Sequence, residues 1–425
     1  MTDKLRVYVG GAFAGILERL DSGYRFRYRA DYAGPPVFLN LPLRQAEKTW
    51  ERFPPPFDGL LPEGVLLDQL LVAGKLDRSD KWGQLTAVGR DLTGFLAVLP
   101  DGMDPEPSVS WRVAERRKAR TRIQPGEGAL PYNWSDLVTF HSREAPKMSL
   151  SGVQPKVSAV FSRKQREFQM VAERGSYILK PGPQAYPEAP INEALSMMLA
   201  RDAGIDVPHC GLAWTRDRYP VFWIERFDRQ GPANRTRLRV EDACQLLEVP
   251  SSWKYLGNLE TLVRVVREFA SNPTLQSALL FDRVLFNWVI GNGDMHLKNW
   301  SLIENGPLIE LAPAYDFLST VLLVDDEEES ALELADRKSG FDHELLLEAF
   351  GRELCGLQPA RIERSLRQLK QVDWAGRIKD CALSESLKTA YLDLVKNRME
   401  RLELAGACRC EIFSRIQEEE TCAEG

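Results

Sequence analysis

The chain has 425 residues, of which 44% are hydrophobic and 27% charged, with a formal net charge of −6. This composition is typical of a folded globular protein and excludes a disordered or fibrous chain. Because single cores usually stop growing at about 250–300 residues, the length predicts more than one packed unit. The acidic balance excludes a surface that is basic all over, as in many nucleic-acid-binding proteins.

The cysteines and the apolar segments indicate the compartment. Seven cysteines are scattered from residue 210 onward and form no CxxC pair, which predicts neither a disulfide framework nor a zinc site. Residues 1–15 contain no long apolar segment, and the sequence has no apolar run of about 18 residues, the length that spans a bilayer. We therefore expect a cytoplasmic protein without membrane contact.

The first hundred residues predict a small β-rich unit with helices added to it. Residues 5–30 contain short apolar runs separated by glycine-containing turns, a pattern typical of strands. Residues 57–76 change to the spacing of an amphipathic helix, and a further apolar run lies at 92–99. We expect these elements to form a domain over residues 1–105.

A basic segment follows this unit. Residues 101–108 have the composition of a linker, and residues 111–122 collect six Lys or Arg with a single Glu. Such a segment is either a solvated helix face or a contact for nucleic acid or an acidic partner. We assign residues 106–147 as a linker with a basic arm that leads into the next unit of the chain.

The rest of the chain predicts a β-rich lobe (148–230) followed by a helical lobe (231–425). In the first lobe, strand patterns lie at 157–161, 167–172, 176–180 and 219–227, and a helix pattern at 191–203. In the second lobe, amphipathic helix patterns lie at 241–248, 259–270, 274–290, 343–350, 359–370 and 386–404. The expected fold class is therefore α+β, and a nucleotide can lie in the cleft between two such lobes.

The strongest functional signal is the sequence GNGDMHLKNW at residues 291–300, just after an apolar helix pattern. Asp294 and Asn299 have the D-x-x-x-x-N spacing of a kinase catalytic loop, in which the Asp accepts the substrate hydroxyl proton and the Asn holds Mg²⁺. Asp316, in the sequence YDF, supplies a second metal ligand. A turn or cap role is the alternative for Asp294 alone. Together the motifs predict phosphoryl transfer, because its transition state needs divalent metal and aligned charged groups.

Two lysines are candidates for binding the nucleotide phosphates. Lys180 ends the strand pattern SYILK, as the kinase lysine does, although a lysine at a strand end can also be merely solvated. Glu193, at the start of the next helix pattern, is a candidate partner for it. Lys156 ends MSLSGVQPK at 148–156, where small residues would let backbone N–H groups approach a phosphate. This segment has a single glycine, so it also fits an ordinary turn.

Together these motifs resemble those of the HipA toxin kinases of bacterial toxin–antitoxin modules. The resemblance rests on SLSGVQPK at 149–156, ILKPG at 178–182, NEALSMMLARDAGI at 192–205, IERFDR at 224–229, GNGDMHLKNWS at 291–301 and LAPAYDFLS at 311–319. The N-terminal sequences VYVGG, AGIL and FDGLLPEG also resemble the N-terminal domain of that family. The blocks occur in the order of the family, and the likeness covers most of the chain.

The resemblance implies a serine/threonine protein kinase whose small N-terminal domain precedes a two-lobed, protein-kinase-like domain. Asp294 would be the catalytic base, and Asn299 and Asp316 would bind Mg²⁺. His296 could instead orient the loop without touching the nucleotide. The implied ATP contacts are Ser151, Gly152, Val153, Gln154, Pro155, Lys156, Lys180, Glu225, Arg226, Phe227, His296, Leu297, Lys298, Asn299, Tyr315, Asp316, Phe317 and Leu318.

The resemblance also implies partners and a modification. The best-known members phosphorylate an aminoacyl-tRNA synthetase and stop translation, so a protein substrate of that kind is expected. The family acts beside a small helix-turn-helix antitoxin that binds operator DNA. Since this chain shows no DNA-recognition motif of its own, we expect DNA contact only through that antitoxin or through the basic segment. Because Ser149 and Ser151 lie in the expected phosphate loop, we also expect autophosphorylation at one or both of them.

Three features depart from the family pattern. Pro155 stands where a more polar residue is usual, and Trp300 replaces a smaller aromatic residue. Ser149 and Ser151 occur where many members have one serine. These departures leave open the nucleotide affinity, the substrate preference and the identity of the modified serine.

Two other functions fit parts of the same pattern. The form G-D-x-H-x-x-x-N at 293–299 also resembles aminoglycoside and choline kinases, so the acceptor could be a small molecule. A degenerate kinase that only co-represses transcription is the second alternative. The set of Asp294, Asn299, Lys180 and Asp316 counts against it, and the N-terminal sequences favour the toxin kinases over the small-molecule enzymes.

Overall fold

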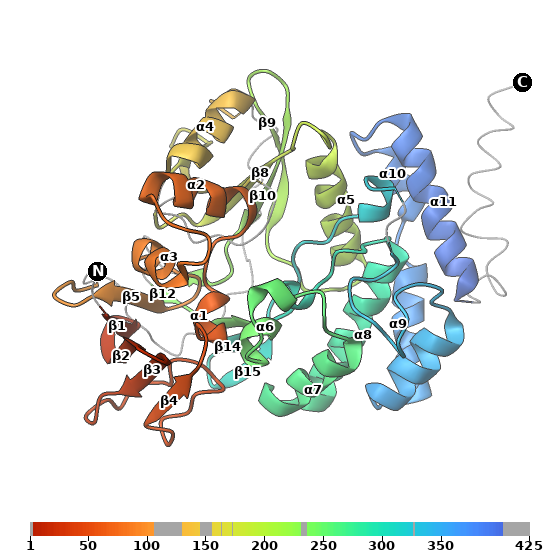
Figure 1. The fold of residues 1–425 in the computed structure, drawn as a ribbon. Coiled ribbons are helices and arrows are strands. Elements are labelled where there is room, and N and C mark those ends of the chain that lie inside the picture. The colour runs from red at the N-terminus through yellow and green to blue at the C-terminus, as the bar shows by residue number, and fades with distance from the viewer. Residues whose placement is uncertain are drawn as a thin grey trace, which may run out of the picture.

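The computed structural model describes residues 3–105, 130–144, 155–162, 164–171, 173–230, 236–325 and 328–402. The basic segment at 111–122 and most of the expected phosphate loop lie outside these residues. Three parts can be distinguished, which we call the N-terminal part (3–105), the β-rich lobe (130–144 and 155–230) and the helical lobe (236–402). The expected α+β architecture is confirmed, and Figure 1 shows the N-terminal part and helices α9 to α11 on opposite sides of the molecule.

The N-terminal part is built on an antiparallel sheet of five strands in the order β4-β3-β2-β1-β5. Its strands are β1 (Lys4–Val9), β2 (Ala12–Leu20), β3 (Gly23–Tyr28), β4 (Glu47–Trp50) and β5 (Leu96–Pro100). Gly10 and Gly11 join β1 to β2 with φ values of 54° and 85°, which glycine adopts without a steric penalty. Val7 on β1 and Phe26 on β3 are fully buried in one core with Phe57.

Three helices cover this sheet: α1 (Pro55–Asp58), α2 (Gly64–Gly74) and α3 (Lys81–Val88). The sequence pattern predicted one helix over 57–76, but the chain leaves the helical path between α1 and α2. Pro62 lies in this interruption, where it cannot donate a backbone hydrogen bond and restricts the residue before it. The resulting connection places Glu63 at the start of α2.

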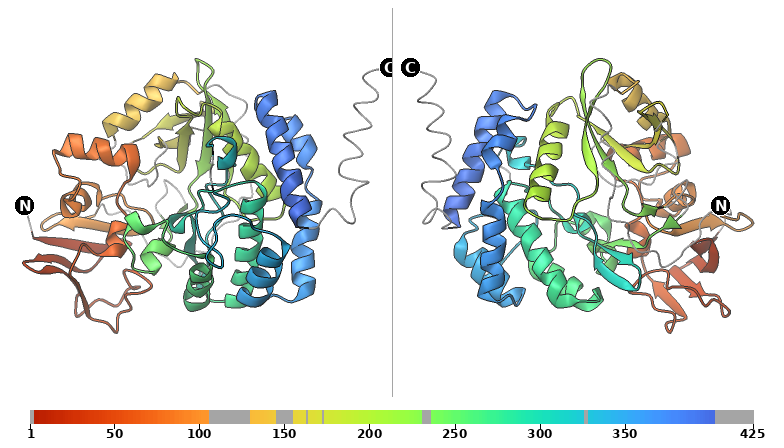
Figure 2. Two further views of the ribbon diagram at one scale, coloured as in Figure 1. Left: turned by 45° about the vertical axis from the view of Figure 1, so that its right-hand side comes forward. Right: turned by 180° about the vertical axis from the view of Figure 1, so that it is seen from behind.

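The β-rich lobe contains a second antiparallel sheet, in the order β7-β6-β8-β10-β9. Its strands are β6 (Val157–Ser162), β7 (Glu167–Met170), β8 (Tyr177–Pro181), β9 (Cys210–Trp214) and β10 (Pro220–Glu225). Helix α5 (Ala189–Asp202) packs on β9 and β10, and α4 (Trp134–Glu144) packs on β6 and β8. The view from behind in Figure 2 shows α5 between this sheet and the helical lobe. The strand and helix patterns predicted for this lobe are confirmed.

The helical lobe holds the large core that surrounds Phe281, Phe286 and Phe317. Its helices are α6 (Ala243–Leu246), η3 (Ser251–Trp253), α7 (Leu259–Phe269), α8 (Pro273–Val289), η4 (Leu297–Asn299), η5 (Thr320–Leu322), the π-helix η6 (Glu344–Leu354), α9 (Pro359–Lys370), α10 (Trp374–Lys379) and α11 (Glu385–Arg401). Side-chain caps begin the two long helices before the site: Asn258 accepts from Thr261 N, and Asn272 accepts from Leu275 N. None of the helices in the described ranges is long and apolar enough to cross a bilayer.

Small sheets interrupt the helices of this region. The helix patterns did not predict these sheets. The strands β13 (Val240–Asp242), β14 (Ser301–Asn305) and β15 (Leu308–Leu311) pair in that order, and β11 (Arg229–Gln230) pairs with β12 (Thr236–Arg237). The helix expected at 241–248 is therefore shorter, because Asp242 pairs with Ser301 in the sheet and then caps α6 in a capping box with Gln245.

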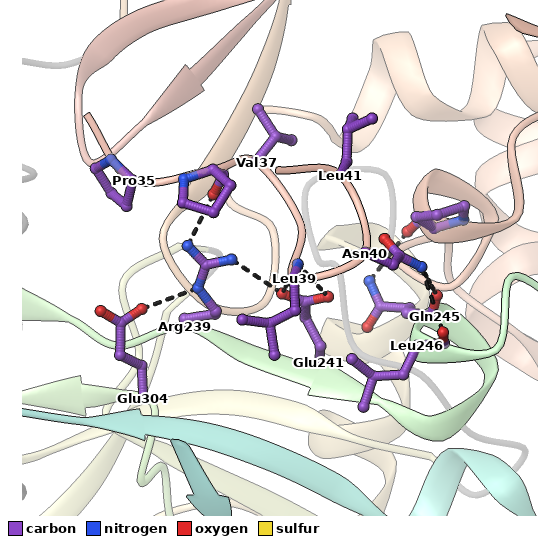
Figure 3. A network of polar contacts seen from close by, with 12 residues as sticks. Pro35, Val37, Leu39, Asn40, Leu41, Arg239, Glu241, Gln245, Leu246 and Glu304 are labelled. Atoms are coloured by element: carbon purple, nitrogen blue, oxygen red, sulfur yellow. Dashed lines mark hydrogen bonds and ion pairs between the residues drawn. The ribbon is translucent and has the colours of Figure 1, made fainter. Parts of the chain in front are cut away.

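The N-terminal part is attached to both lobes. Helix α2 lies against α4, and α1 lies against α6. Figure 3 shows the contact made by the loop that contains residues 35–41. Arg239 donates to the carbonyl of Pro36 (2.8 Å) and to Glu241 (3.2 Å) and Glu304 (2.9 Å), while Leu39 N donates to Glu241 (3.0 Å).

A buried ion cluster forms a second attachment. Asp91 accepts from Arg229 (3.0 Å) and Arg237 (2.5 Å), and Asp228 accepts from Gly94 N (3.2 Å). Burial would raise the pKa of Asp91, but the arginines lower it to about 2. The carboxylate is therefore ionised over the physiological range, and its burial is compensated by two cations.

Candidate active site

The loop at residues 291–300 joins α8 to β14 and is closely packed against the residues that follow Asp316. Gly291 has φ +69°, and a Cβ there would lie 2.5 Å from Cγ2 of Val321. Only glycine fits this position without displacing the neighbouring chain. Gly293 N donates to Thr320 Oγ1 (2.8 Å), which fixes the loop one residue before Asp294.

Asp294, the expected catalytic base, is partly buried and contacts a tyrosine from a distant segment. The hydroxyl of Tyr255 donates to Oδ1 of Asp294 at 2.7 Å. Burial raises the pKa of Asp294 above its ordinary value, and the hydrogen bond from Tyr255 opposes that rise. A carboxylate with a raised pKa is a better proton acceptor than an exposed aspartate.

Two asparagines hold the backbone of the loop around Asp294. Asn299 donates from its side-chain amide to the carbonyl of Asp294 (3.0 Å). Asn292 accepts from the N–H of Asp294 (3.3 Å) and donates to the carbonyl of Asp316 (3.0 Å). Asn292 thus links the segment of the expected base to the segment of the expected metal carboxylate.

Lys180 joins the two lobes through a pair of carboxylates. Its Nζ lies 2.5 Å from Oε1 of Glu193 on α5 and 2.5 Å from Oδ1 of Asp316. The expected pairing of Lys180 with Glu193 is therefore present. Burial would raise the pKa of Asp316, but Lys180 and Lys156 lower it below the usual range, whereas burial raises the pKa of Glu193. Asp316 is thus ionised beside a charged lysine.

Asp316 itself has φ 57°, in the left-handed region that few non-glycine residues adopt. Such backbone strain is common at functional sites, because the surrounding structure must hold the residue in place. Here Asn292 bonds the carbonyl of Asp316, and Asn192 on α5 clamps the chain at Ser319 through two hydrogen bonds (2.9 and 2.8 Å).

The expected phosphate loop is described only at its end. Ser149, Ser151, Gly152, Val153 and Gln154 lie outside the described residues, whereas Pro155 and Lys156 lie directly before β6. Lys156 is buried, and burial lowers its pKa while the carboxylate of Asp316 opposes that change. A second buried cation therefore lies near Asp316 and Lys180.

The residues between Asp294 and Asn299 differ in what they face. His296 stacks edge-to-face on Tyr255 with ring centroids 5.0 Å apart, and burial lowers its pKa to about 3, so the ring is neutral. Its Nδ1 is buried without a hydrogen-bond partner in the structure. Leu297 is a core residue. The ammonium of Lys298 is bound by Asp242 and by the carbonyl of Gly59 (both 2.9 Å), toward the N-terminal part.

The expected hinge residues also have structural contacts. The backbone of Glu225 bonds His209 O (2.8 Å), and burial raises the pKa of its carboxyl group. Arg226 makes two hydrogen bonds to Asp228 (2.9 and 2.6 Å) within the buried ion cluster. Phe227 packs beside Tyr315, with ring centroids 5.6 Å apart. The side chain of Arg226 is thus occupied by the attachment of the N-terminal part, and nucleotide contacts of these residues remain predictions.

The residues around Asp316 anchor its segment in the core. Tyr315 bonds Ser301 Oγ (2.6 Å) and the carbonyl of Lys298 (3.1 Å). Phe317 is fully buried and stacks on Phe286 at 5.5 Å, whereas Leu318 is only partly buried. The structure therefore brings Lys156, Lys180, Asp294, Asn299 and Asp316 into one region between the lobes.

Comparison with known proteins identifies the family. A model of the HipA N-terminal domain matches residues 5–99, and a model of the HipA-like C-terminal domain matches residues 148–375, more than half of the chain. The chain belongs to the HipA family. The resemblance noted in the sequence motifs is thereby confirmed over the greater part of this HipA-family chain.

Curated relatives of this HipA-family chain are described as kinases. The putative kinase Y4mE of Sinorhizobium fredii is 30% identical over 313 residues, which are 71% of this chain and 72% of that protein. The serine/threonine-protein kinase toxin HipA of Shewanella oneidensis is 28% identical over 299 residues, 65% of each protein. The match thus spans about two thirds of the length of such relatives.

A solved structure supports the fold. It contains HipA of Shewanella oneidensis together with HipB and its operator DNA. The TM-score is 0.71 at 21% sequence identity, and the match covers 94% of this chain and 97% of the other. The fold of the N-terminal part and of both lobes is thus that of HipA.

Several site residues of this HipA-family chain were not singled out from the sequence. Tyr255 and Asn192 come from segments far from Asp294, and nothing in their local patterns indicates a contact with the site. Asn292 lies inside the motif GNGD, but the kinase spacing assigns roles only to Asp294 and Asn299. Hydrogen bonds of Asn292 to both motif segments show why an amide is needed there.

The residues present fit both ATP and Mg²⁺. The carboxylate of Asp316 and the amide oxygen of Asn299 are hard oxygen donors, which Mg²⁺ prefers together with phosphate oxygens. Within the described ranges no group of three or more His, Cys, Asp and Glu could form a metal cage. Mg²⁺ is commonly bound by one or two carboxylates plus the phosphates of its substrate. Lys156 and Lys180 provide the buried positive charge that phosphates require.

Proposed function

We propose that this HipA-family protein is an ATP- and Mg²⁺-dependent serine/threonine protein kinase. The observation that carries the proposal is the arrangement around Lys180, which binds Glu193 and Asp316 at 2.5 Å each while Asn292 links Asp316 to the loop of Asp294. Phosphoryl transfer needs a phosphate-binding lysine, metal-binding oxygens and a proton acceptor in one place. These groups come from different lobes, so their convergence is not a local feature of one motif.

Each residue has a role in the proposed reaction. Asp294 accepts the proton of the acceptor hydroxyl, and Tyr255 stabilises the ionised form of that carboxylate. Asp316 and Asn299 would hold Mg²⁺, and Lys180 and Lys156 would bind the phosphates. Bound Mg²⁺-ATP supplies the phosphoryl group and neutralises part of the charge that develops during transfer. Asn292 holds Asp294 and Asp316 in fixed positions relative to each other through its hydrogen bonds to both.

The substrate and the regulation belong to the same proposal. We infer a protein acceptor, such as an aminoacyl-tRNA synthetase, since the relative from Shewanella is named a serine/threonine-protein kinase toxin. Its structural complex contains HipB and operator DNA, so we propose a small DNA-binding antitoxin as the partner of this chain. We also propose autophosphorylation at Ser149 or Ser151. A phosphoserine with about −1.5 to −2 charge would repel the nucleotide phosphates from that loop.

Transfer of radiolabel tests the proposal. Purified protein, Mg²⁺ and γ-labelled ATP are added to a bacterial lysate, and the label is followed into proteins and into soluble metabolites. Label in a protein band that is absent with Asp294→Gln supports a protein kinase. Label only in a metabolite would instead support a small-molecule phosphotransferase. No transfer at all would support the alternative of a degenerate kinase that acts only by binding. Phosphoproteomics after brief expression of the wild type beside Asp294→Gln then names the acceptor.

The serines are tested separately by intact-mass analysis. We would incubate wild type, Ser149→Ala, Ser151→Ala and Asp294→Gln with Mg²⁺-ATP and measure their intact masses. We expect added phosphate in the wild type and its loss in one of the serine variants and in Asp294→Gln. An active wild type without phosphate on either serine would reject this form of regulation.

A further inference from the structure

Glu63 connects the N-terminal part to the candidate catalytic loop. It precedes α2, directly after the interruption that separates α1 from α2, and its side chain is only 18% exposed. Its Oε2 lies 2.8 Å from Nζ of Lys254, and its Oε1 lies 3.6 Å from Nζ of Lys298. One carboxylate of the N-terminal part thus contacts two lysines of the helical lobe.

Both lysines are next to residues of the site. Lys254 precedes Tyr255, the hydrogen-bond donor to Asp294, and its carbonyl accepts from Leu297 N at 3.0 Å. Lys298 precedes Asn299, the expected metal ligand. Displacement of Lys254 would therefore move the backbone of Tyr255, the partner of the proton acceptor. Displacement of Lys298 would move the backbone of Asn299, the expected metal ligand.

The contacts of Glu63 with Lys254 and Lys298 are ion pairs. Burial would raise the pKa of Glu63, but Lys298 and Lys254 lower it below its ordinary value, so the carboxylate is ionised. Lys298 is further held by Asp242 and by Gly59 O, another group of the N-terminal part. Lys254, by contrast, has the shorter of the two contacts with Glu63 and is only 12% exposed. Loss of the Glu63 charge would thus affect the Lys254 segment more than Lys298.

We propose that Glu63 is a positioning residue, which acts through Lys254 and Tyr255 to orient Asp294 for proton acceptance. The inference rests on the proposed kinase function for its kinetic readout. It makes the N-terminal part a component of the active site rather than an appendage. The chemistry at the acceptor hydroxyl then depends on Glu63.

The same interface offers a matched control. Lys48 on β4 forms an ion pair with Glu248, which follows α6, and Trp50 Nε1 also donates to Glu248 at 3.4 Å. This pair joins the N-terminal part to the helical lobe but has no contact with residues 254–257 or 291–300 among the interactions described above. Glu248→Gln therefore removes an interface charge of the same kind without a link to Tyr255.

The experiment compares full-length Glu63→Gln, Glu63→Asp, Lys254→Met and Glu248→Gln with the wild type. We expect kcat to fall about tenfold in Glu63→Gln and Lys254→Met with an unchanged KM for ATP, because misplacement of a catalytic group affects the chemical step. Glu63→Asp keeps the charge and should recover part of the rate. Glu248→Gln should stay within about twofold of the wild type, as expected for a partly exposed ion pair.

Hydrogen exchange separates this inference from the proposed function. Amides of 254–257 and 292–300 should exchange faster in Glu63→Gln and Lys254→Met than in Glu248→Gln, whether or not the wild type transfers phosphate. A wild type without transfer would therefore reject the kinase but not the positioning role. Unchanged exchange and kcat in folded Glu63→Gln would overturn the positioning role. Equal losses of kcat in Glu63→Gln and Glu248→Gln would also overturn it, since they would show that Glu63 only attaches the N-terminal part to the helical lobe.

Discussion

Tyr255 donates a hydrogen bond of 2.7 Å to Asp294, although the two residues are 39 positions apart in the chain. Burial raises the pKa of Asp294, and this hydrogen bond lowers it, so the two effects oppose each other at the proton acceptor. The balance between them decides at which pH the carboxylate is ionised.

The first prediction concerns the pH dependence of transfer. Asp294 accepts a proton only when ionised, so the rate is lost as the pH falls through its raised pKa. In Tyr255→Phe the effect that lowers the pKa is gone and burial remains, so the acid limb of kcat/KM should move to higher pH. The pH–rate profiles of wild type and variant measure this shift. Tyr219→Phe, an exposed tyrosine in another region, is the control, and coincident acid limbs in all proteins would contradict the role of Tyr255.

The second prediction concerns the base itself. Asp294→Gln replaces the carboxylate by a neutral amide that is one methylene longer, which removes the proton acceptor, so transfer should fall by about 10²-fold or more. The unfolding midpoint should change little, because Asp294 is only partly buried and lies in a loop. Growth arrest on expression should disappear as well. A variant that is folded and still transfers phosphate at the wild-type rate would contradict the assignment.

The third prediction concerns the metal. Asp316→Asn removes the negative charge of one Mg²⁺ ligand, and Asn299→Ala removes an oxygen ligand, so both variants should require more Mg²⁺ for half-maximal activity. Binding of ATP without metal should change less. Rates are measured against Mg²⁺ concentration, and nucleotide binding is measured in chelator as the control. Wild-type activity of either variant at low Mg²⁺ would remove that residue from the metal site.

The fourth prediction concerns the ion pairs of Lys180. Lys180→Met leaves the carboxylates of Glu193 and Asp316 buried without their shared cation, so the free energy of unfolding should fall by roughly 3–5 kcal/mol. Lys4→Met removes one of two cations that pair with Glu18, at a lysine that is 61% exposed, and it should cost no more than about 1 kcal/mol. Urea unfolding measures both. Similar losses in the two variants would show that burial of the Lys180 pairs contributes little.

The sequence predicted those features that depend on local spacing. The strand that ends at Lys180, the helix that begins near Glu193 and the order of the lobes follow from periodicity, and their positions agree with the structure. The pairing of Lys180 with Glu193 was also expected, because a strand and the next helix meet at a known place in kinases. Asp294, Asn299 and Asp316 lie within motifs whose spacing can be read directly.

Contacts between distant segments could not be predicted in this way. Glu63 and Lys254 are 191 positions apart, and neither has a local pattern that indicates the other. FDGLLPEG was recognised as a family sequence, but its spacing assigns no chemistry to its glutamate. The strand β13 was missed because residues 240–242 pair with β14 after a long excursion of the chain, and this pairing overrides the helix pattern.

The ion cluster around Asp91 has a consequence for synthesis on the ribosome. Its partners Arg229 and Arg237 are translated 138 and 146 residues later. The core of the N-terminal part can form as soon as β5 has emerged, since domains fold from the N-terminus onward. Asp91 then remains hydrated until β12 follows, and the catalytic loop emerges later still. A nascent chain therefore carries a folded N-terminal part well before its catalytic loop has been made.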